Sequence, residues 1–137
     1  FVAPILGAAT GTSLAATGAI TSSGTAGIGY ATGAGGIVTQ ATSKATAFTL
    51  SKITGQITTA ADALGAGAIV SATWTNTVIA ATDIVVVTHV SGGTVGAYTI
   101  NVAAGTGSAT LTLRNNTAGS LSEALVIGFA VIKGAIN

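Results

Sequence analysis

Short segments in which apolar and polar residues alternate recur from about residue 36 onward, and this period of two constrains the fold more than any other feature. Residues 69–76, IVSATWTN, place apolar side chains on one face and Ser and Thr on the other. Residues 98–102 and 109–114 repeat the pattern, with Gly, Asn and Ser between the segments. Such segments, at a spacing of roughly 8–14 residues, are typical of strands in all-β proteins. The sequence predicts an antiparallel, jelly-roll-like β-sandwich of about eight strands over residues 36–137.

The remaining strands are expected at residues 37–40, 48–50, 56–59, 84–90 and 123–133. Gly55 is expected to form a turn between Ile53 and Ile57, and residues 62–67 are expected to form a loop. The alternation predicts a set of core side chains, which comprises Phe48, Ile57, Val70, Trp74, Val86, Ile100, Leu111 and Phe129. No amphipathic helix of useful length is apparent, which argues against alternating strands and helices.

The last expected strand, 123–133, is apolar on both faces. Leu125, Ile127, Phe129 and Val131 alternate with a second set of apolar residues. A strand of an antiparallel sandwich normally has one face in water, so two dry faces predict that a second layer or subunit covers the outer one. We assign the bulkier set to the core and the smaller set to a subunit interface formed by Ala124, Val126, Gly128, Ala130 and Ile132.

Residues 1–35 differ from the rest of the chain because they consist mostly of Gly, Ala, Ser and Thr and carry no charge. Gly and Thr are poor helix formers, and the few large apolar residues are too scattered for a core. An isolated extended segment leaves its backbone groups unpaired, so little structure is expected here without identical copies or a partner surface. We predict an extended arm over residues 1–35 and a sandwich that folds without it.

Charged residues make up only 5% of the chain, and the net charge is +1. Ordinary soluble domains have roughly 25%. Without a basic stripe to neutralise phosphates, nucleic acid is not an expected partner. The longest apolar run covers residues 124–132, and a membrane-spanning helix needs about 18 or more such residues, so membrane insertion is not expected either. A surface this poor in charge favours a chain that works inside an assembly.

Few residues could carry out chemistry. The acids are Asp62, Asp83 and Glu123, and the single histidine is His89. His89 lacks the company that a metal site needs, and six strand residues place Asp83 about 20 Å from it, too far for a catalytic triad. A glycoside hydrolase or esterase remains a weakly supported alternative, because no aromatic-lined sugar platform accompanies the acids. We expect no catalytic residue, cofactor or metal.

Three further residues have a structural interpretation and a functional one. Asp83 is interpreted as a turn residue before an apolar strand rather than as a catalytic acid. Trp74 is assigned to the core rather than to a ligand-stacking site, because it lies on the apolar face of an alternating segment. Asn115 begins the glycosylation sequence Asn-Asn-Thr, which we interpret as a turn.

The phrase FVAPILGAATGTSLAATGAITSSG resembles the low-complexity shaft segments of bacteriophage tail fibres. The phrases GIGYATGAGGIVTQATSKATAFTLSKITGQITT and TAGSLSEALVIGFAVIKG resemble a C-terminal domain of phage structural proteins, so the resemblance covers essentially the whole chain. It implies a virion protein without depolymerase activity, in which three chains form a β-rich shaft and sandwich heads.

The resemblance leads to two expectations about function. The first is the C-terminal part of a trimeric tail fibre, displaying a sandwich head for attachment to a host-surface glycan. The alternative is a capsid decoration protein whose arm clamps neighbouring major capsid proteins. In both, the partners are further copies of the chain and other virion proteins. A non-viral extracellular filament subunit is also compatible with the composition.

Overall fold

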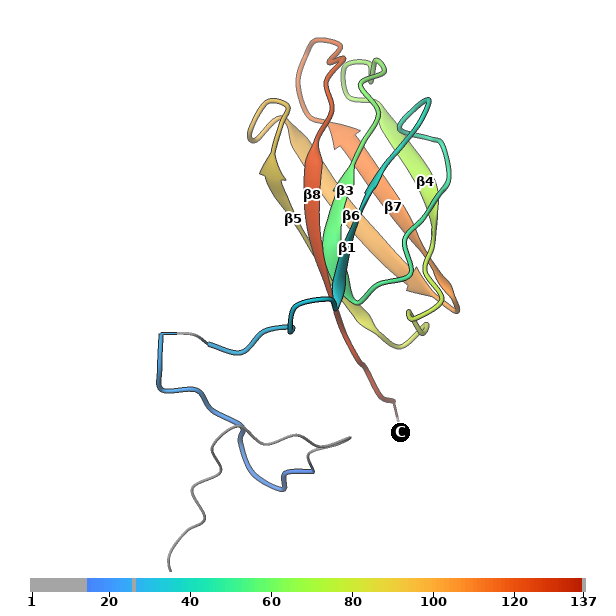
Figure 1. Cartoon of the computed structure of the whole chain (residues 1–137). Helices are drawn as coiled ribbons and strands as arrows, with labels where there is room; N and C mark the ends of the chain where they lie inside the picture. The colour runs from blue at the N-terminus through green and yellow to red at the C-terminus, as the bar shows by residue number, and fades with distance from the viewer. Residues whose placement is uncertain (1–14, 26, 137) are drawn as a thin grey trace, which may run out of the picture.

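The computed structural model describes residues 15–25 and 27–136, and within them the chain is all-β. Eight strands form two four-stranded sheets that pack face to face (Figure 1). The strands are β1 (Gly35–Thr39), β2 (Phe48–Thr49), β3 (Thr54–Thr58), β4 (Ile69–Thr75), β5 (Ile84–Ser91), β6 (Tyr98–Gly105), β7 (Ser108–Asn115) and β8 (Val126–Ile132). The predicted β-sandwich of about eight strands is confirmed.

The chain crosses repeatedly between the two sheets. Sheet A has the strand order β1-β3-β8-β5, and sheet B has the order β2-β4-β7-β6. Among the described strands, only β6 and β7 are neighbours both in the chain and in a sheet. Both sheets are mixed rather than purely antiparallel, because β1 pairs in parallel with β3, and β2 with β4. The jelly-roll order of the strands stays a prediction.

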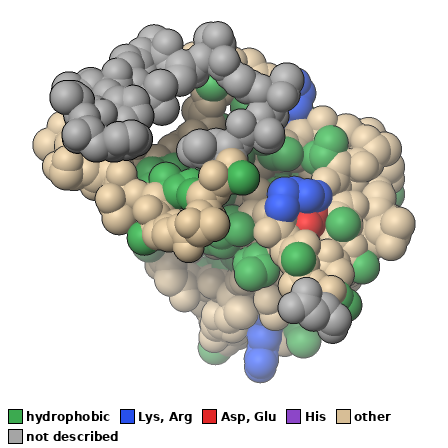
Figure 2. Space-filling model, turned by 90° about the horizontal axis from the view of Figure 1, so that it is seen from below, with side chains coloured by type: hydrophobic (Ala, Val, Ile, Leu, Met, Phe, Trp, Pro, Cys, Tyr) green, Lys and Arg blue, Asp and Glu red, His purple; other side chains and the backbone are tan. Residues whose placement is uncertain are grey.

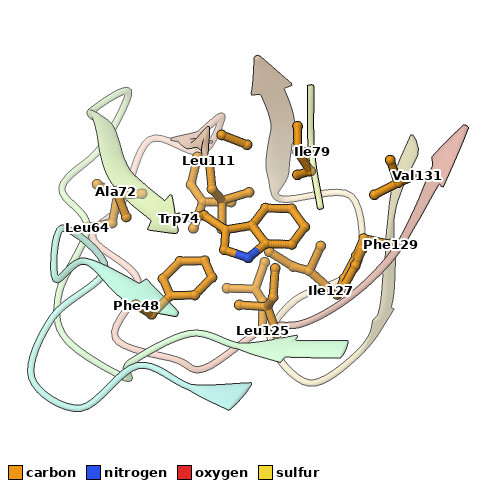
Figure 3. Close-up of a cluster of buried hydrophobic side chains, with 13 residues drawn as sticks. Phe48, Leu64, Ala72, Trp74, Ile79, Leu111, Leu125, Ile127, Phe129 and Val131 are labelled. Carbon is orange, nitrogen blue, oxygen red and sulfur yellow. The ribbon is translucent and has the colours of Figure 1, made fainter. Parts of the chain in front are cut away.

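The core lies between the sheets around Trp74, whose side chain is fully buried (Figure 3). The indole ring stacks on Phe48 at a centroid distance of 6.0 Å and meets Phe129 edge-on at 4.6 Å. Its N–H donates to the carbonyl oxygen of Leu50 at 3.1 Å, so burial leaves this polar atom satisfied. The assignment of Trp74 to the core is confirmed.

Most of the predicted core positions are confirmed. Phe48, Ile57, Trp74, Leu111 and Phe129 are buried, while Val70 and Ile100 are half-buried and pack against them. The assignment of Val86 to the core is wrong, because this residue is 49% exposed on the outer face of β5. Its neighbours Val85 and Val87 pack against the core instead. The run IVVV has apolar residues at every position, so the alternation could not decide which of them face inward.

Gly55 does not form the predicted turn, because it lies inside β3 and faces Gly36 of β1. Its φ of 151° falls in the region that favours glycine. A Cβ atom built on Gly55 would lie only 2.0 Å from the carbonyl oxygen of Gly36. Glycine therefore serves close approach of two parallel strands at this position, whereas the sequence pattern suggested a reversal of the chain.

The last strand is shorter than predicted. β8 covers Val126–Ile132 rather than residues 123–133. Ile127, Phe129 and Val131 face the core, as expected, and buried Leu125 precedes the strand. The backbone of Leu125 makes two hydrogen bonds with Thr59. Its carbonyl oxygen accepts from the Thr59 backbone N–H at 2.9 Å, and its N–H donates to the Thr59 hydroxyl at 3.0 Å. A side-chain hydroxyl thus accepts from the Leu125 N–H, and the regular ladder with β3 begins one residue later, at Val126.

The described part of the arm, residues 15–25 and 27–34, contains no strand and is almost entirely exposed. It leaves the sandwich beside the C-terminal segment (Figure 1). The Tyr30 hydroxyl donates to the carbonyl oxygen of Val131, which ties the arm to the end of β8. Residues 1–14 and 26, on which much of the arm prediction rests, lie outside the described residues. The division at residue 35 stays a prediction, although β1 begins at Gly35.

Candidate interaction surface

Asp83 is bound into the fold just before β5. One of its carboxylate oxygens accepts from the Ala80 N–H at 2.8 Å and from the Lys133 ammonium at 2.5 Å. The other accepts from the Gly134 N–H at 3.1 Å. The Ala80 N–H, followed by the Lys133 ammonium, lowers the pKa of Asp83, and this exceeds the opposing effect of burial. The turn interpretation is confirmed, and this carboxylate links the start of β5 to the end of β8.

The carboxylate of Glu123, near the other end of β8, is likewise held by hydrogen bonds. Its carboxylate accepts from the Thr94 N–H at 2.6 Å and from the Thr94 hydroxyl at 3.2 Å. The Thr94 N–H is the main cause of a lowered pKa of Glu123. Burial, and then the nearby Glu123 carboxylate, raises the pKa of Tyr98 to about 12. Glu123 therefore holds the loop between β5 and β6 rather than facing a cleft.

The third acid, Asp62, takes part in a buried polar cluster that the sequence did not reveal. Lys44 is only 2% exposed, and its ammonium donates to the Ala60 carbonyl at 2.9 Å and to the Asp62 carbonyl. The Asp62 carboxylate lies 3.4 Å from this ammonium and accepts from the Lys44 N–H at 2.8 Å. Nearby Gln40 donates to the carbonyls of Lys44 and Thr46. Together these contacts hold the loop between β1 and β2.

His89 lies half-buried on β5 at the end opposite Asp83. Its Nε2 atom is 3.1 Å from the Ser91 carbonyl oxygen and 2.6 Å from that of Gly92. The two residues therefore do not form a catalytic pair. Among the described residues, no three His, Cys, Asp or Glu side chains gather into a group that could hold a metal ion.

Asn115 is a structural residue at the end of β7. Its side chain is fully buried, and its amide donates to the carbonyls of Leu64, Gly65 and Gly119 at 2.9, 3.1 and 2.7 Å. Its side-chain oxygen accepts from the Thr117 N–H at 2.9 Å, which is the turn expected from the sequence. A side chain held in this way is not accessible to a glycan-transferring enzyme in the folded protein.

The outer surfaces of the two sheets differ in how many large apolar side chains they expose. The outer face of sheet B is polar, because β4, β6 and β7 point Ser, Thr, Asn and Arg side chains outward. Ser71 and Thr112, for example, lie across from one another with their hydroxyls 2.9 Å apart. Ile69 is the one large apolar residue on these outward positions. Sheet B therefore has the ordinary wet face of a sandwich.

The outer face of sheet A carries no charged residue on its strands, and it combines exposed apolar side chains with the uncharged polar residues Thr39, Thr54, Gln56, Thr58 and Thr88. We call the apolar part of this surface the apolar face, and it consists of Ile37, Ile84, Val86, Val90, Val126, Gly128, Ala130 and Ile132. The Ile37 side chain is 82% exposed, and Ile84 and Ile132, which pair with each other, are 59% and 52% exposed. Large exposed apolar patches on soluble proteins mark interaction sites.

The centre of this outer face is shallowly concave, with a depression of about 290 Å³ lined by residues 54–56, 86–88 and 128–130. Gly128 stands between Gln56 of β3 and Thr88 of β5, and a Cβ atom built on it would lie only 2.9 Å from the side chain of Val90. Of the five residues predicted at a subunit interface, Val126, Gly128, Ala130 and Ile132 lie on this face. Ala124 precedes β8 and is half-buried. Their assignment to an interface stays a prediction.

Charged side chains are sparse on the surface as a whole. Figure 2, which views the molecule from the end where the C-terminal segment leaves, shows hydrophobic side chains scattered over this end and only a few charged ones. The described part of the chain contains no helix with the length and hydrophobicity required to span a membrane. Comparison of the chain with protein-family models, curated proteins and solved structures found no match.

Proposed function

We propose that the chain is a non-enzymatic structural component of a bacteriophage particle, namely the C-terminal part of a trimeric tail fibre. In this proposal three sandwich heads associate through their apolar faces and attach the virion to a host-surface glycan. The observation that carries the self-association is the contrast between the two sheets, since the large exposed apolar side chains Ile37, Ile84, Val86, Val90 and Ile132 gather on the uncharged outer face of sheet A, whereas Ile69 is the one such residue on the strands of sheet B. The phage assignment rests on the resemblance of the sequence segments quoted above to those of phage structural proteins.

The described contacts also support a structural role over a catalytic one. Asp62, Asp83 and Glu123 each accept hydrogen bonds that hold a loop or join two strands. A catalytic pair of acids needs side chains that face a common cleft. The arm leaves the sandwich next to the end of β8. Arms from copies joined at their apolar faces would therefore start close together, as the chains of a fibre shaft must.

Native mass spectrometry or analytical ultracentrifugation at micromolar concentration tests the self-association. We expect a particle of three times the 12.9 kDa chain mass. A folded, stable monomer under these conditions would overturn the proposal. Labelling purified virions with an antibody to the sandwich tests the location, and signal at the tips of tail fibres is expected.

A capsid decoration protein is the second candidate, and the exposed arm is the observation that favours it. Residues 15–25 and 27–33 are exposed along their length, as a segment that clamps a neighbouring protein would be before binding. The two candidates differ in copy number, because a decoration protein covers the capsid lattice whereas fibres are few. Quantitative mass spectrometry against the major capsid protein separates them.

A further inference from the structure

β5 is a long strand at the free edge of sheet A. It pairs only with β8, and its eight residues, IVVVTHVS, include no proline and no charged residue. Natural sheets protect free edges with short strands, lysine, proline or bulges, because an unprotected edge pairs with another strand. β1 and β2 are short, with five and two residues. β5 lacks that protection over most of its length.

Only the C-terminal end of β5 departs from regular pairing. The pairing with β8 shifts register between His89 and Ser91, as in a β-bulge. The His89 ring contacts the carbonyl oxygens of Ser91 and Gly92, so it occupies acceptors at this end. The regular free edge therefore covers residues 84–88. Its outward side chains are Ile84, Val86 and Thr88, of which Ile84 and Val86 belong to the apolar face.

The opposite edge of sheet A is β1, and it complements β5. β1 is also uncharged, and its central residue Ile37 is 82% exposed on the apolar face. β1 is parallel to β3, while β3 and β5 are both antiparallel to β8. β1 and β5 therefore run in the same direction. A rotation axis parallel to the strands keeps this direction, so it would bring β5 of one copy beside β1 of the next in parallel.

We propose that the 84–88 edge of one copy pairs in parallel with β1 of a second copy, so that sheet A continues from copy to copy. This inference rests on the proposed self-association and specifies how it is built. The pairing satisfies backbone groups on both edges and brings Ile37 of one copy beside Ile84 and Val86 of the other. With three copies around an axis, each β5 finds a β1, and the ring closes without a free edge in sheet A.

β6, the free edge of sheet B, is a poorer docking strand. It is as long as β5 and uncharged, but its outward side chains include Thr99 and Asn101. Extending sheet B would continue a polar face, which gains little from leaving water. β6 therefore provides a matched control edge on the same molecule.

Cysteine cross-linking tests the pairing, because the chain contains no cysteine of its own. The variants are Ile37→Cys/Val86→Cys and, for a shifted register, Ile37→Cys/Thr88→Cys, treated with mild oxidant or a short bis-maleimide. Within one chain β1 and β5 are three strand spacings apart, about 14 Å. A disulfide needs Cα atoms within about 7 Å, so any disulfide must join two copies.

We expect at least one double variant to form a covalent trimer in denaturing gels, while Ile37→Cys/Asn101→Cys, on the β6 edge, stays monomeric. Covalent dimers from Val86→Cys alone would indicate antiparallel β5–β5 pairing about a twofold axis and would overturn the proposal. If the wild type is trimeric and the double variants fold and assemble without cross-linking, the β1–β5 pairing is wrong and the proposed self-association stands. A monomeric wild type overturns both.

Discussion

Phe129 is a core residue that makes contacts within both sheets. It belongs to β8 of sheet A and meets Trp74 of sheet B edge-on, with ring centroids 4.6 Å apart (Figure 3). Its backbone carbonyl accepts from the Thr54 hydroxyl at 3.0 Å, which adds a contact to β3. A side chain with these contacts specifies how the sheets sit on one another, because an edge-on aromatic pair has a defined geometry.

Replacing Phe129 with Ala should lower the free energy of unfolding by about 3–5 kcal/mol, since it removes apolar burial and leaves a cavity beside Trp74. The loss should appear at low and at high protein concentration, because the contact lies within one chain. Urea unfolding monitored by Trp74 fluorescence measures it. The control is Ile132→Ala on the exposed face of the same strand, which should change chain stability by well under this amount. Equal effects of the two substitutions would contradict the assignment of faces.

Asp83 should make stability depend on pH in acid. Its pKa lies below the ordinary value of 3.8 in the folded protein, so its contribution is fully present above that pH. This contribution is lost as the pH falls from 3.8 through the lowered pKa that the Asp83 carboxyl has in the folded protein. Asp83→Asn should therefore melt at a lower temperature than the wild type at pH 7, and the difference should shrink in acid.

Thermal unfolding followed by circular dichroism over a pH series measures this effect. Glu123→Gln is the matched comparison, because the pKa of Glu123 is lowered by a different backbone contact, at Thr94. A difference between Asp83→Asn and the wild type that stays constant down to pH 2 would show that the Asp83 carboxylate does not titrate as described.

At the scale of the elements, the strands of sheet B were the most predictable. β4, β6 and β7 each alternate between one apolar and one polar face, so both their position and their inward side chains could be predicted. In sheet A the periodic signal fails where both faces are apolar. The location of β5 was predicted but not its phase, and Val86 was assigned to the wrong side.

Other features depend on partners that are distant in the chain. Gly55 sits in a strand because Gly36 approaches it, and nothing within residues 53–57 indicates that contact. Lys44 is buried because the carbonyls of Ala60 and Asp62 surround its ammonium, which contradicts the usual exposure of lysine. The apolar outer side of β8 could be predicted, but the contribution of β1 and β5 to the same face required the strand order.

Substitution of Ala130 by Asp should dissociate the assembly before it unfolds the chain. Ala130 lies on the apolar face, between Thr54 of β3 and Val86 of β5, and is half-buried in the single chain. Covering this face with a second copy would leave the new carboxylate buried without a partner, which is expensive. Analytical ultracentrifugation should show monomers, and the far-ultraviolet circular dichroism should remain that of a β-sandwich.

Thr110→Asp, on the polar outer face of sheet B, is the matched control and should leave both the assembly and the fold unchanged. Full assembly of Ala130→Asp with an unchanged melting temperature would mean that the apolar face stays open to water. The subunit contact would then have to lie elsewhere on the molecule.

At the scale of the whole molecule, we expect the sandwich to fold without the arm. A chain that begins at Gly35 keeps β1 and every buried core residue, and it loses the Tyr30 contact to the Val131 carbonyl. Circular dichroism and cooperative thermal unfolding should resemble those of the full chain. Loss of the β-sheet signal on truncation would show that the arm belongs to the folded unit.

The central position of β8 in sheet A has a consequence for synthesis. β3 and β5 are connected in the sheet only through β8, which is synthesised after the other seven described strands. Until residues 126–132 emerge, sheet A consists of the β1–β3 pair and a separate β5, while the β6–β7 hairpin of sheet B can already form. Nascent or prematurely terminated chains thus lack the strand that holds β1 and β5 in one sheet, as the proposed pairing between copies requires. In the proposed assembly, strand order alone would therefore exclude incomplete molecules.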